Sequence, residues 1–206
     1  LDVAAGEIHS LVGENGAGKS TLMRVLSGMY APSAGRMEVN SRDVTGWTTA
    51  QAIAAGVGMV HQHFMLVPTL TVAENIVLGR ELTSHGQLDR AAAERTVAEL
   101  CQRTGLVVAP DRKVSDLSVG EAQRVEILKT LYRGARILIL DEPTAVLSPP
   151  EVEELWRVLG RMRDAGDTII LITHKLDEVM AISNTVTVIR HGRTVGRIAT
   201  RATSPS

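Results

Sequence analysis

The segment 13–20 constrains the fold of this chain more than any other part of its sequence. It reads GENGAGKS and matches the pattern G-x-x-x-x-G-K-[ST]. An apolar run typical of a buried strand precedes it (8–12), and a helical pattern follows it (19–27). Glycines in such a turn let backbone N–H groups surround phosphate oxygens, and the helix N-terminus favours their negative charge. We therefore expect a nucleoside triphosphate site between a strand and a helix, rather than a glycine-rich turn without a ligand.

Each residue type in this phosphate loop has an expected role. The Lys19 ammonium reaches the β- and γ-phosphates, and the Ser20 hydroxyl is a ligand for Mg²⁺. The residues expected to bind the nucleotide here are Gly13, Asn15, Gly16, Ala17, Gly18, Lys19, Ser20 and Thr21.

A second part of the site is expected after the aliphatic run 137–140, which ends in Asp141 and Glu142. Acidic residues at the carboxyl end of a parallel strand lie beside the ligand crevice of an α/β sheet. Asp141 is therefore expected to hold Mg²⁺. Glu142 is expected to orient and deprotonate the attacking water. The alternative is an acidic strand end that caps the next helix, and the presence of the phosphate loop disfavours it.

The remaining patterns predict an α/β fold with a mostly parallel sheet, because strands and helices alternate. The expected strands are 8–12, 36–39, 57–60, 137–140, 168–173, 185–189 and 194–198, and the expected helices are 19–27, 48–55, 119–132, 151–163 and 176–182. The last two strands form a small antiparallel hairpin around His191 and Gly192. A helical pattern also covers 71–103, broken at 84–86. An all-helical subdomain, about 70–134, is thus expected within a single domain that covers residues 1–206.

Composition excludes several other classes of protein. Lys and Arg number 22 and Asp and Glu 23, so the net charge of −1 argues against nucleic acid held by bulk charge. The single cysteine, Cys101, excludes an internal disulfide and indicates a reducing compartment. The longest apolar runs have strand length, so no membrane span is expected. The first residues lack the pattern of a secretion signal, and both ends are expected to be cut from a longer chain.

The run LSVGEAQR at 117–124 opens the helix expected at 119–132. Ser118 and Glu121 have the spacing of a capping box, which is an ordinary way to begin a helix. A helix N-terminus that carries a hydroxyl and a glycine, Gly120, is also suited to face a phosphate. The local residues leave both interpretations open.

The motifs together resemble those of ABC-type ATPases over nearly the whole chain. The resemblance rests on the order and spacing of the phosphate loop, Gln62, the run 117–121, the run DEPT at 141–144, and His174. The runs VHQHFMLV at 60–67 and LYRGAR at 131–136 look like the first nucleotide-binding half of bacterial nucleoside and simple-sugar importer ATPases. This resemblance implies a P-loop NTPase fold of the RecA-like type, with ATP and Mg²⁺ as cofactors.

In the family that the chain resembles, two such domains bind head to tail around ATP. The phosphate loop of one domain and the helix start of the other, here Ser118, Gly120 and Glu121, enclose each nucleotide. The resemblance also implies that Gln62 contacts Mg²⁺ and water, and that His174 contacts the γ-phosphate. The implied catalytic residues are Glu142, His174 and Gln62, and the implied metal ligands are Ser20, Gln62 and Asp141.

The resemblance further implies partners and a location. The partners are a second nucleotide-binding domain, a transmembrane permease and, indirectly, an external solute-binding protein. The location is the cytoplasmic face of the cell membrane. Phe64, Met65 and Leu66 follow Gln62 and are expected to be partly exposed until the permease covers them, unless they form a core-facing strand exit.

Several residues depart from the usual family pattern. Val119 stands where the family usually has Gly, Glu121 where it usually has Gln, and Ala122 where Gln is frequent. Ser148 stands where the family usually has Asp. Glu121 places negative charge near an expected phosphate, so we expect it to weaken binding across the interface. The aromatic residue that stacks on adenine in the family would lie upstream of Leu1.

Other functions fit the residues less well. A GTPase-type switch is disfavoured because His174 stands where its N-K-x-D motif has Asn. An ABC ATPase of the repair or translation type stays as the alternative, although 70–134 shows no coiled-coil or basic insertion. His61 and His63 could mimic a metal pair, but no third ligand is near them in the sequence. The transported solute cannot be inferred from these residues.

Overall fold

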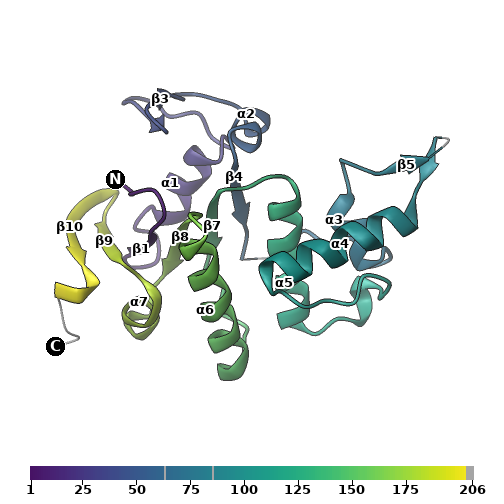
Figure 1. Ribbon diagram of the computed structural model, residues 1–206. Helices are drawn as coiled ribbons and strands as arrows, with labels where there is room; N and C mark the ends of the chain where they lie inside the picture. Colours follow the sequence, from purple (N-terminus) through teal and green to yellow (C-terminus); the bar gives the residue numbers. More distant parts are fainter. Residues whose placement is uncertain (63, 85, 203–206) are drawn as a thin grey trace.

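The computed structural model describes residues 1–62, 64–84 and 86–202. Its centre is a six-stranded sheet in the order β10-β9-β1-β8-β7-β4 (Figure 1). Neighbouring strands from β9 to β4 run parallel, and β10 pairs antiparallel with β9 at the edge. These strands are β1 (Ile8–Val12), β4 (Val57–Val60), β7 (Ile137–Asp141), β8 (Thr168–Thr173), β9 (Thr185–Arg190) and β10 (Arg193–Ala199). The expected α/β fold with a mostly parallel sheet is confirmed.

The helices of the described residues lie around this sheet and beyond its β4 edge (Figure 1). They are α1 (Lys19–Leu26), α2 (Thr49–Ala54), α3 (Val72–Val77), α4 (Arg90–Thr104), α5 (Val119–Tyr132), α6 (Pro149–Asp164) and α7 (Leu176–Ile182). Two small antiparallel sheets pair β2 (Glu38–Val39) with β3 (Arg42–Asp43) and β5 (Thr83–Ser84) with β6 (Gln87–Leu88). Single 3-10 turns occur at Val114–Asp116 and Thr200–Ala202.

Alternating side chains along the central strands divide the core into two layers. On β7, Leu138 and Leu140 join the core beneath α3–α6, whereas Ile139 joins the core beneath α1 and α2. Ile169 and Ile170 on β8 separate in the same way. Successive side chains of a strand point to opposite faces, so a continuous aliphatic run supplies both layers. The sheet is therefore buried on both faces, which leaves its carboxyl-terminal edge to present polar groups.

The region 70–134 is not all helical, so that expectation is wrong. The β5–β6 hairpin interrupts it, and a 3-10 turn precedes α5. Gly86, just before β6, has φ +79°, a backbone conformation that an α-helix does not accommodate. Val97 of α4 and Val125 of α5 share one core with β7 and β8. The helical region is therefore packed continuously onto the sheet.

Two expected boundaries also differ. The strand expected at 36–39 begins two residues later, at Glu38, and ends as expected before the turn at Asn40 and Ser41, which have φ of 51° and 61°. The helix expected from residue 151 begins at Pro149, with Ser148 as its N-cap. Proline is compatible with the first helical turn, where its missing N–H has no partner to lose.

We predict that burial of His9 makes the protein less stable as the pH falls through about 6.5. His9 is fully buried on β1, where Nδ1 lies 2.9 Å from Glu7 and Nε2 lies 2.8 Å from the Thr187 hydroxyl. Burial lowers the pKa of His9, although Glu7 opposes that shift. Because the unfolded chain then binds the extra proton more readily, acid favours unfolding, by at most about 1.4 kcal/mol per pH unit.

The measurement is the free energy of unfolding of the wild type and of His9→Gln, by denaturant titration between pH 7.5 and pH 5. Groups that His9 does not contact titrate equally in both proteins, and Glu7, whose pKa is lowered in the folded protein, stays ionised over this range, so the difference isolates His9. The wild type should lose stability relative to His9→Gln on acidification. A difference that stays constant over this range would contradict the prediction.

Candidate functional site

The phosphate loop lies between β1 and α1 and depends on its glycines. Gly16 and Gly18 have φ of +80° and +100°, a backbone conformation that other residues rarely adopt. A Cβ atom on Gly13 would lie 2.2 Å from the Ile189 carbonyl oxygen, so this residue has no room for a side chain beside β9. The loop and the first turn of α1 contain all the predicted nucleotide-binding residues of this segment: Gly13, Asn15, Gly16, Ala17, Gly18, Lys19, Ser20 and Thr21.

Lys19 is buried at the start of α1 and folds back over the loop. Its Nζ donates hydrogen bonds to the carbonyl oxygens of Gly13 (2.6 Å) and Glu14 (3.0 Å). Gly18, the N-cap of α1, supplies no side-chain cap, so the helix N-terminus keeps free donors facing the loop. An ammonium group and a helix N-terminus meet at the loop, as phosphate binding requires.

Ser20 and Asp141 bring the two predicted metal-binding segments together. The Ser20 hydroxyl donates to Asp141 Oδ1 at 3.2 Å. Asp141 is buried at the end of β7, and Ser20 lies in the first turn of α1 after β1. Parallel strands place these carboxyl ends at the same edge of the sheet. Hydroxyl and carboxylate oxygens are ligands that Mg²⁺ prefers, so this pair fits a magnesium ion.

Glu142 and His174 form the next contact along this edge. Glu142 Oε1 lies 3.1 Å from His174 Nδ1, and the two residues follow β7 and β8. Glu142 has φ +48°, and its N–H donates to the Ile172 carbonyl at 2.9 Å. This conformation turns the carboxylate away from the strand while β8 holds its backbone. The carboxylate is about 20% exposed and the imidazole about 52%, so both remain accessible to water or substrate.

Gln62 is less firmly placed than the other predicted residues. It is exposed two residues after β4, which pairs with β7. Within the described ranges, no hydrogen bond connects it to Ser20 or Asp141. His61 is half-buried, and His63, the other histidine of the suggested metal pair, lies outside the described residues. The part of the chain that the structure describes contains no cluster of three or more His, Cys, Asp or Glu suited to a metal.

The start of α5 is a capping box, as the sequence predicted. Ser118 Oγ accepts from the Glu121 N–H at 3.2 Å, and Glu121 Oε2 accepts from the Ser118 N–H at 2.8 Å. Arg112 Nη1 lies 2.6 Å from Glu121 Oε1. The pKa of Glu121 is lowered, mainly by the Ser118 N–H and also by Arg112. The carboxylate is therefore held ionised and paired. Among the described residues, no hydrogen bond or ion pair connects Ser118, Gly120 or Glu121 to the phosphate loop of the same chain.

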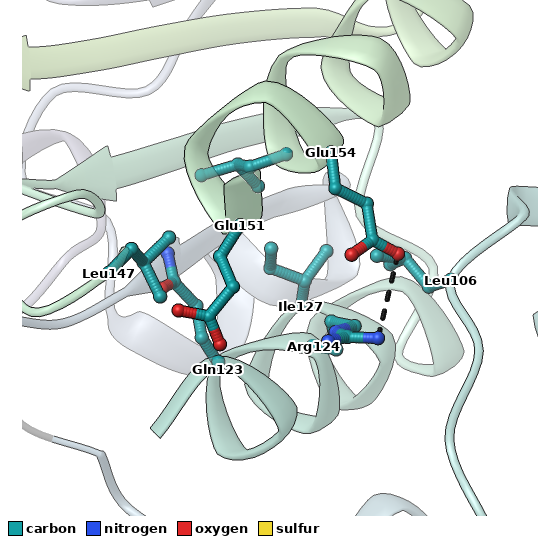
Figure 2. Close-up of a pocket in the computed structure, with 9 residues that line it drawn as sticks. Leu106, Gln123, Arg124, Ile127, Leu147, Glu151 and Glu154 are labelled. Carbon is teal, nitrogen blue, oxygen red and sulfur yellow. Dashed lines mark ion pairs between the residues drawn. The ribbon is translucent and has the colours of Figure 1, made fainter. Parts of the chain in front are cut away.

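Gly120 has a packing role that the sequence did not reveal. Figure 2 shows Glu151 reaching from α6 toward the first turns of α5. A Cβ atom on Gly120 would lie 2.1 Å from Glu151 Oε1, so the glycine admits this side chain. Ser148 Oγ also donates to Glu151 Oε2 at 2.6 Å. Ser148, which replaces the usual acid, thus caps α6, and Glu151 connects the loop after Glu142 to the start of α5.

Comparison with known proteins decides the family. The ABC transporter family matches residues 1–145. The nucleoside import ATP-binding protein NupA of Lactococcus lactis is 52% identical over 96% of this chain, and the guanosine import ATP-binding protein NupO of Bacillus subtilis is 53% identical over 99%. The chain belongs to the ABC transporter family. It spans about two fifths of the length of these relatives, 39% of NupA and 40% of NupO.

The fold of this ABC transporter chain agrees with a solved ATP-binding cassette. The dimeric structure of the cassette MJ0796 bound to ADP and Pi superposes with a TM-score of 0.82 at 24% identity, over 98% of this chain and 88% of that one. The expected P-loop NTPase fold is thus confirmed. No helix within the described ranges is long and apolar enough to cross a bilayer.

Sequence reasoning missed Glu178, which holds together the chain segments at the ends of β7 and β8. It is buried in the first turn of α7 and accepts hydrogen bonds from the Thr144 hydroxyl and from the Thr173 hydroxyl (2.8 Å). Lys175 Nζ pairs with it at 3.0 Å. The chain segments after β7 and β8 carry Glu142 and His174, so Glu178 fixes their relative positions. The sequence signal that could have identified Glu178 is an acidic residue on the apolar face of a short predicted helix.

Proposed function

We propose that this chain binds and hydrolyses ATP to energise an ABC importer for a nucleoside or a simple sugar. One observation carries the proposal: a single edge of the sheet assembles Lys19, which lies over the phosphate loop, with two contacting pairs, Ser20 with Asp141 and Glu142 with His174. The names of the two relatives support import of a nucleoside. Their match covers nearly the whole chain.

The geometry supports a division of roles within the site. Loop N–H groups and the Lys19 ammonium bind the β- and γ-phosphates. Ser20 and Asp141 would hold Mg²⁺, which supplies charge neutralisation for the phosphates, and Gln62 is the further ligand implied by resemblance. The Glu142 carboxylate accepts the proton of the attacking water, because it is accessible and held by its backbone hydrogen bond. His174, in contact with Glu142, orients the carboxylate and meets the γ-phosphate.

A second nucleotide-binding domain completes the site in this proposal. Ser118, Gly120 and Glu121 lie on α5, away from the phosphate loop, so they are available to face ATP held by another domain. The dimeric form of the MJ0796 cassette with ADP and Pi supports that arrangement. The second domain is either another copy or a tandem half fused to this one. The permease, the external solute-binding protein and a position at the cytoplasmic face of the membrane are further parts of the proposal.

The experiment that tests this function is transport in vesicles. The cassette, in its full-length native protein, is reconstituted with the permease encoded beside its gene, and uptake of labelled nucleosides and pentoses is measured with and without MgATP. ATP-dependent uptake of one of these solutes supports the proposal. Neighbouring genes that encode no permease, together with ATP hydrolysis that no solute stimulates, would instead indicate an ATPase without a transport role.

The residues after Gln62 form a surface suited to the permease. Met65 is about 66% exposed, whereas Phe64 and Leu66 are half-buried, and Leu66 packs against the core. The expectation of partial exposure is therefore met most clearly by Met65. A groove of about 230 Å³ lies beside it, with Met29, Ile53 and Met59 in its lining.

The backbone of Met65 is held from α5. Its N–H donates to Glu126 Oε1 at 2.5 Å, and its carbonyl accepts from Lys129 Nζ at 2.9 Å. Both side chains are buried, and burial lowers the pKa of Lys129. The side chain of Met65 can therefore change without loss of the contacts that hold the segment.

We predict that Met65→Glu weakens binding to the permease at least about tenfold while the protein stays folded. A carboxylate would have to be desolvated in an apolar interface, which costs about 1–3 kcal/mol or more. Co-purification with the permease and basal ATP hydrolysis are measured together. Val195→Glu is the matched control, because Val195 is similarly exposed (about 59%) on β10. Equal loss of binding in both variants, or unfolding of Met65→Glu, would contradict the prediction.

A further inference from the structure

Glu121 brings a carboxylate to a helix start that, in the proposed function, receives a phosphate. Two anions at one helix N-terminus compete for the same positive end of the helix dipole. Glu121 is about 26% exposed, so solvent does not fully screen its charge. The structure shows how this conflict is resolved.

Both oxygens of the Glu121 carboxylate are occupied. Oε2 accepts from the Ser118 N–H at 2.8 Å, and Oε1 lies 2.6 Å from Arg112 Nη1. Arg112 Nη2 also donates to the Asp116 carbonyl. The Arg112 guanidinium therefore connects the 3-10 turn, through the Asp116 carbonyl, to the first turn of α5, through the Glu121 carboxylate.

The backbone around Arg112 is held in place by residues 68–73, which lead into α3 and form its first turn. The Arg112 carbonyl accepts from the Val72 N–H (2.9 Å), and the Val114 N–H donates to the Leu70 carbonyl (3.0 Å). Hydrogen bonds from Ala73 to Pro110 and from Ser115 to Pro68 extend this pairing. The guanidinium is therefore presented from a fixed strip of chain, which reduces the entropy lost on pairing.

Two other charged residues near this helix start have partners of their own. Arg124 of α5 contacts Glu154 of α6 at 3.5 Å, and Figure 2 shows this pair beside the small cavity between the two helices. Glu151 is held by Ser148. Arg112 is the cation directed at Glu121.

Such a pair contributes little to the stability of the fold. A partly exposed ion pair contributes about 0–1 kcal/mol to folding. The same geometry occurs at the start of α3, where Thr71 and Glu74 form a capping box and Arg90 lies 2.9 Å from Glu74. That helix start faces the α4 region rather than an expected nucleotide, so it supplies an internal comparison.

We propose that Arg112 is a charge-compensating positioning residue for the ATP bound across the domain interface. It holds the Glu121 carboxylate back and offsets its charge, so that the α5 N-terminus can accept the γ-phosphate held by the second domain. This inference rests on the proposed function. Glu121 is therefore expected to weaken ATP binding across the interface only when Arg112 is absent.

The test is a double-mutant cycle on the full-length protein. Arg112→Gln, Glu121→Gln and the double variant are compared for ATP hydrolysis and for ATP-dependent association of nucleotide-binding domains. Arg112→Gln should raise the KM for ATP about tenfold or more, because like charges then oppose one another. The double variant should recover to within about threefold of wild type, because glutamine keeps the cap without the charge.

Two further measurements separate charge compensation from a structural role. Raising the ionic strength should bring Arg112→Gln closer to wild type, because salt screens the repulsion. Arg112→Lys keeps the positive charge but not the planar guanidinium with its several donors. It should retain most of the activity even if Arg112→Gln folds poorly. The matched control, Arg90→Gln, should leave the KM for ATP unchanged.

The outcomes distinguish this inference from the proposed function. If the wild type is active and the double variant is no better than Arg112→Gln, charge compensation is wrong and the proposed function stands. The same holds if Arg90→Gln impairs activity as much as Arg112→Gln. If the wild type neither hydrolyses ATP nor associates with ATP, the proposed function fails, and the inference fails with it.

Discussion

Glu142→Gln is expected to lower ATP hydrolysis by about 10²-fold or more while ATP still binds within about threefold of the wild-type affinity. The amide has the size of the carboxylate but cannot accept a proton from water. The backbone hydrogen bond to Ile172 and the contact with His174 do not depend on that proton, so the site should keep its shape. Single-turnover hydrolysis of labelled ATP measures the chemical step, and equilibrium binding of the same nucleotide measures affinity.

A control for this variant should remove a nearby negative charge from a residue that has no role in the proposed reaction. Asp177→Asn does so, because Asp177 is exposed in the first turn of α7, three residues after His174. It should hydrolyse ATP within about threefold of wild type. Equal hydrolysis by Glu142→Gln and wild type would remove Glu142 from the mechanism. Equal loss in both variants would show that local charge, rather than proton transfer, is responsible.

Lys19→Ala should weaken ATP binding by roughly 30-fold to several thousandfold. Loss of one partner of a desolvated, hydrogen-bonded charge pair costs about 2–5 kcal/mol, and each 1.4 kcal/mol is a factor of ten in affinity. Lys19 is about 6% exposed and lies over the phosphate loop, so its ammonium meets the phosphates with little competing water. Isothermal titration with MgATP gives the affinity directly.

The same substitution removes the hydrogen bonds from Lys19 to Gly13 and Glu14, so loop disorder must be separated from lost charge. Lys19→Gln can keep one donor to these carbonyls without the charge and should bind ATP almost as poorly as Lys19→Ala. Lys113→Ala removes an exposed lysine from the helical region and should bind ATP as the wild type does. Recovery of tight binding in Lys19→Gln would show that loop geometry, not charge, is the contribution of Lys19.

The sequence by itself determined the α/β fold and the residues at the sheet edge. The motif at 13–20 and the acidic end of 137–140 specify local structures, a strand–loop–helix turn and a strand end, whose chemistry depends on few distant contacts. Because parallel strands place their carboxyl ends together, Ser20 and Asp141 could be paired before their 3.2 Å contact was known. The capping box of Ser118 and Glu121 is equally local, and its spacing is sufficient to identify it.

Only the tertiary structure decided which distant side chains hold these local parts in position. Glu178 reaches Thr144 from 34 residues away, and Arg112 reaches Glu121 because its strip of chain pairs with the residues before α3. Position 120 has no room for a side chain because Glu151, on another helix, occupies that space. Such contacts depend on packing between elements, and no periodicity or motif in one segment encodes them. The physical reason is that a side chain's role follows from what folding places beside it, whereas a turn or a cap follows from its own few residues.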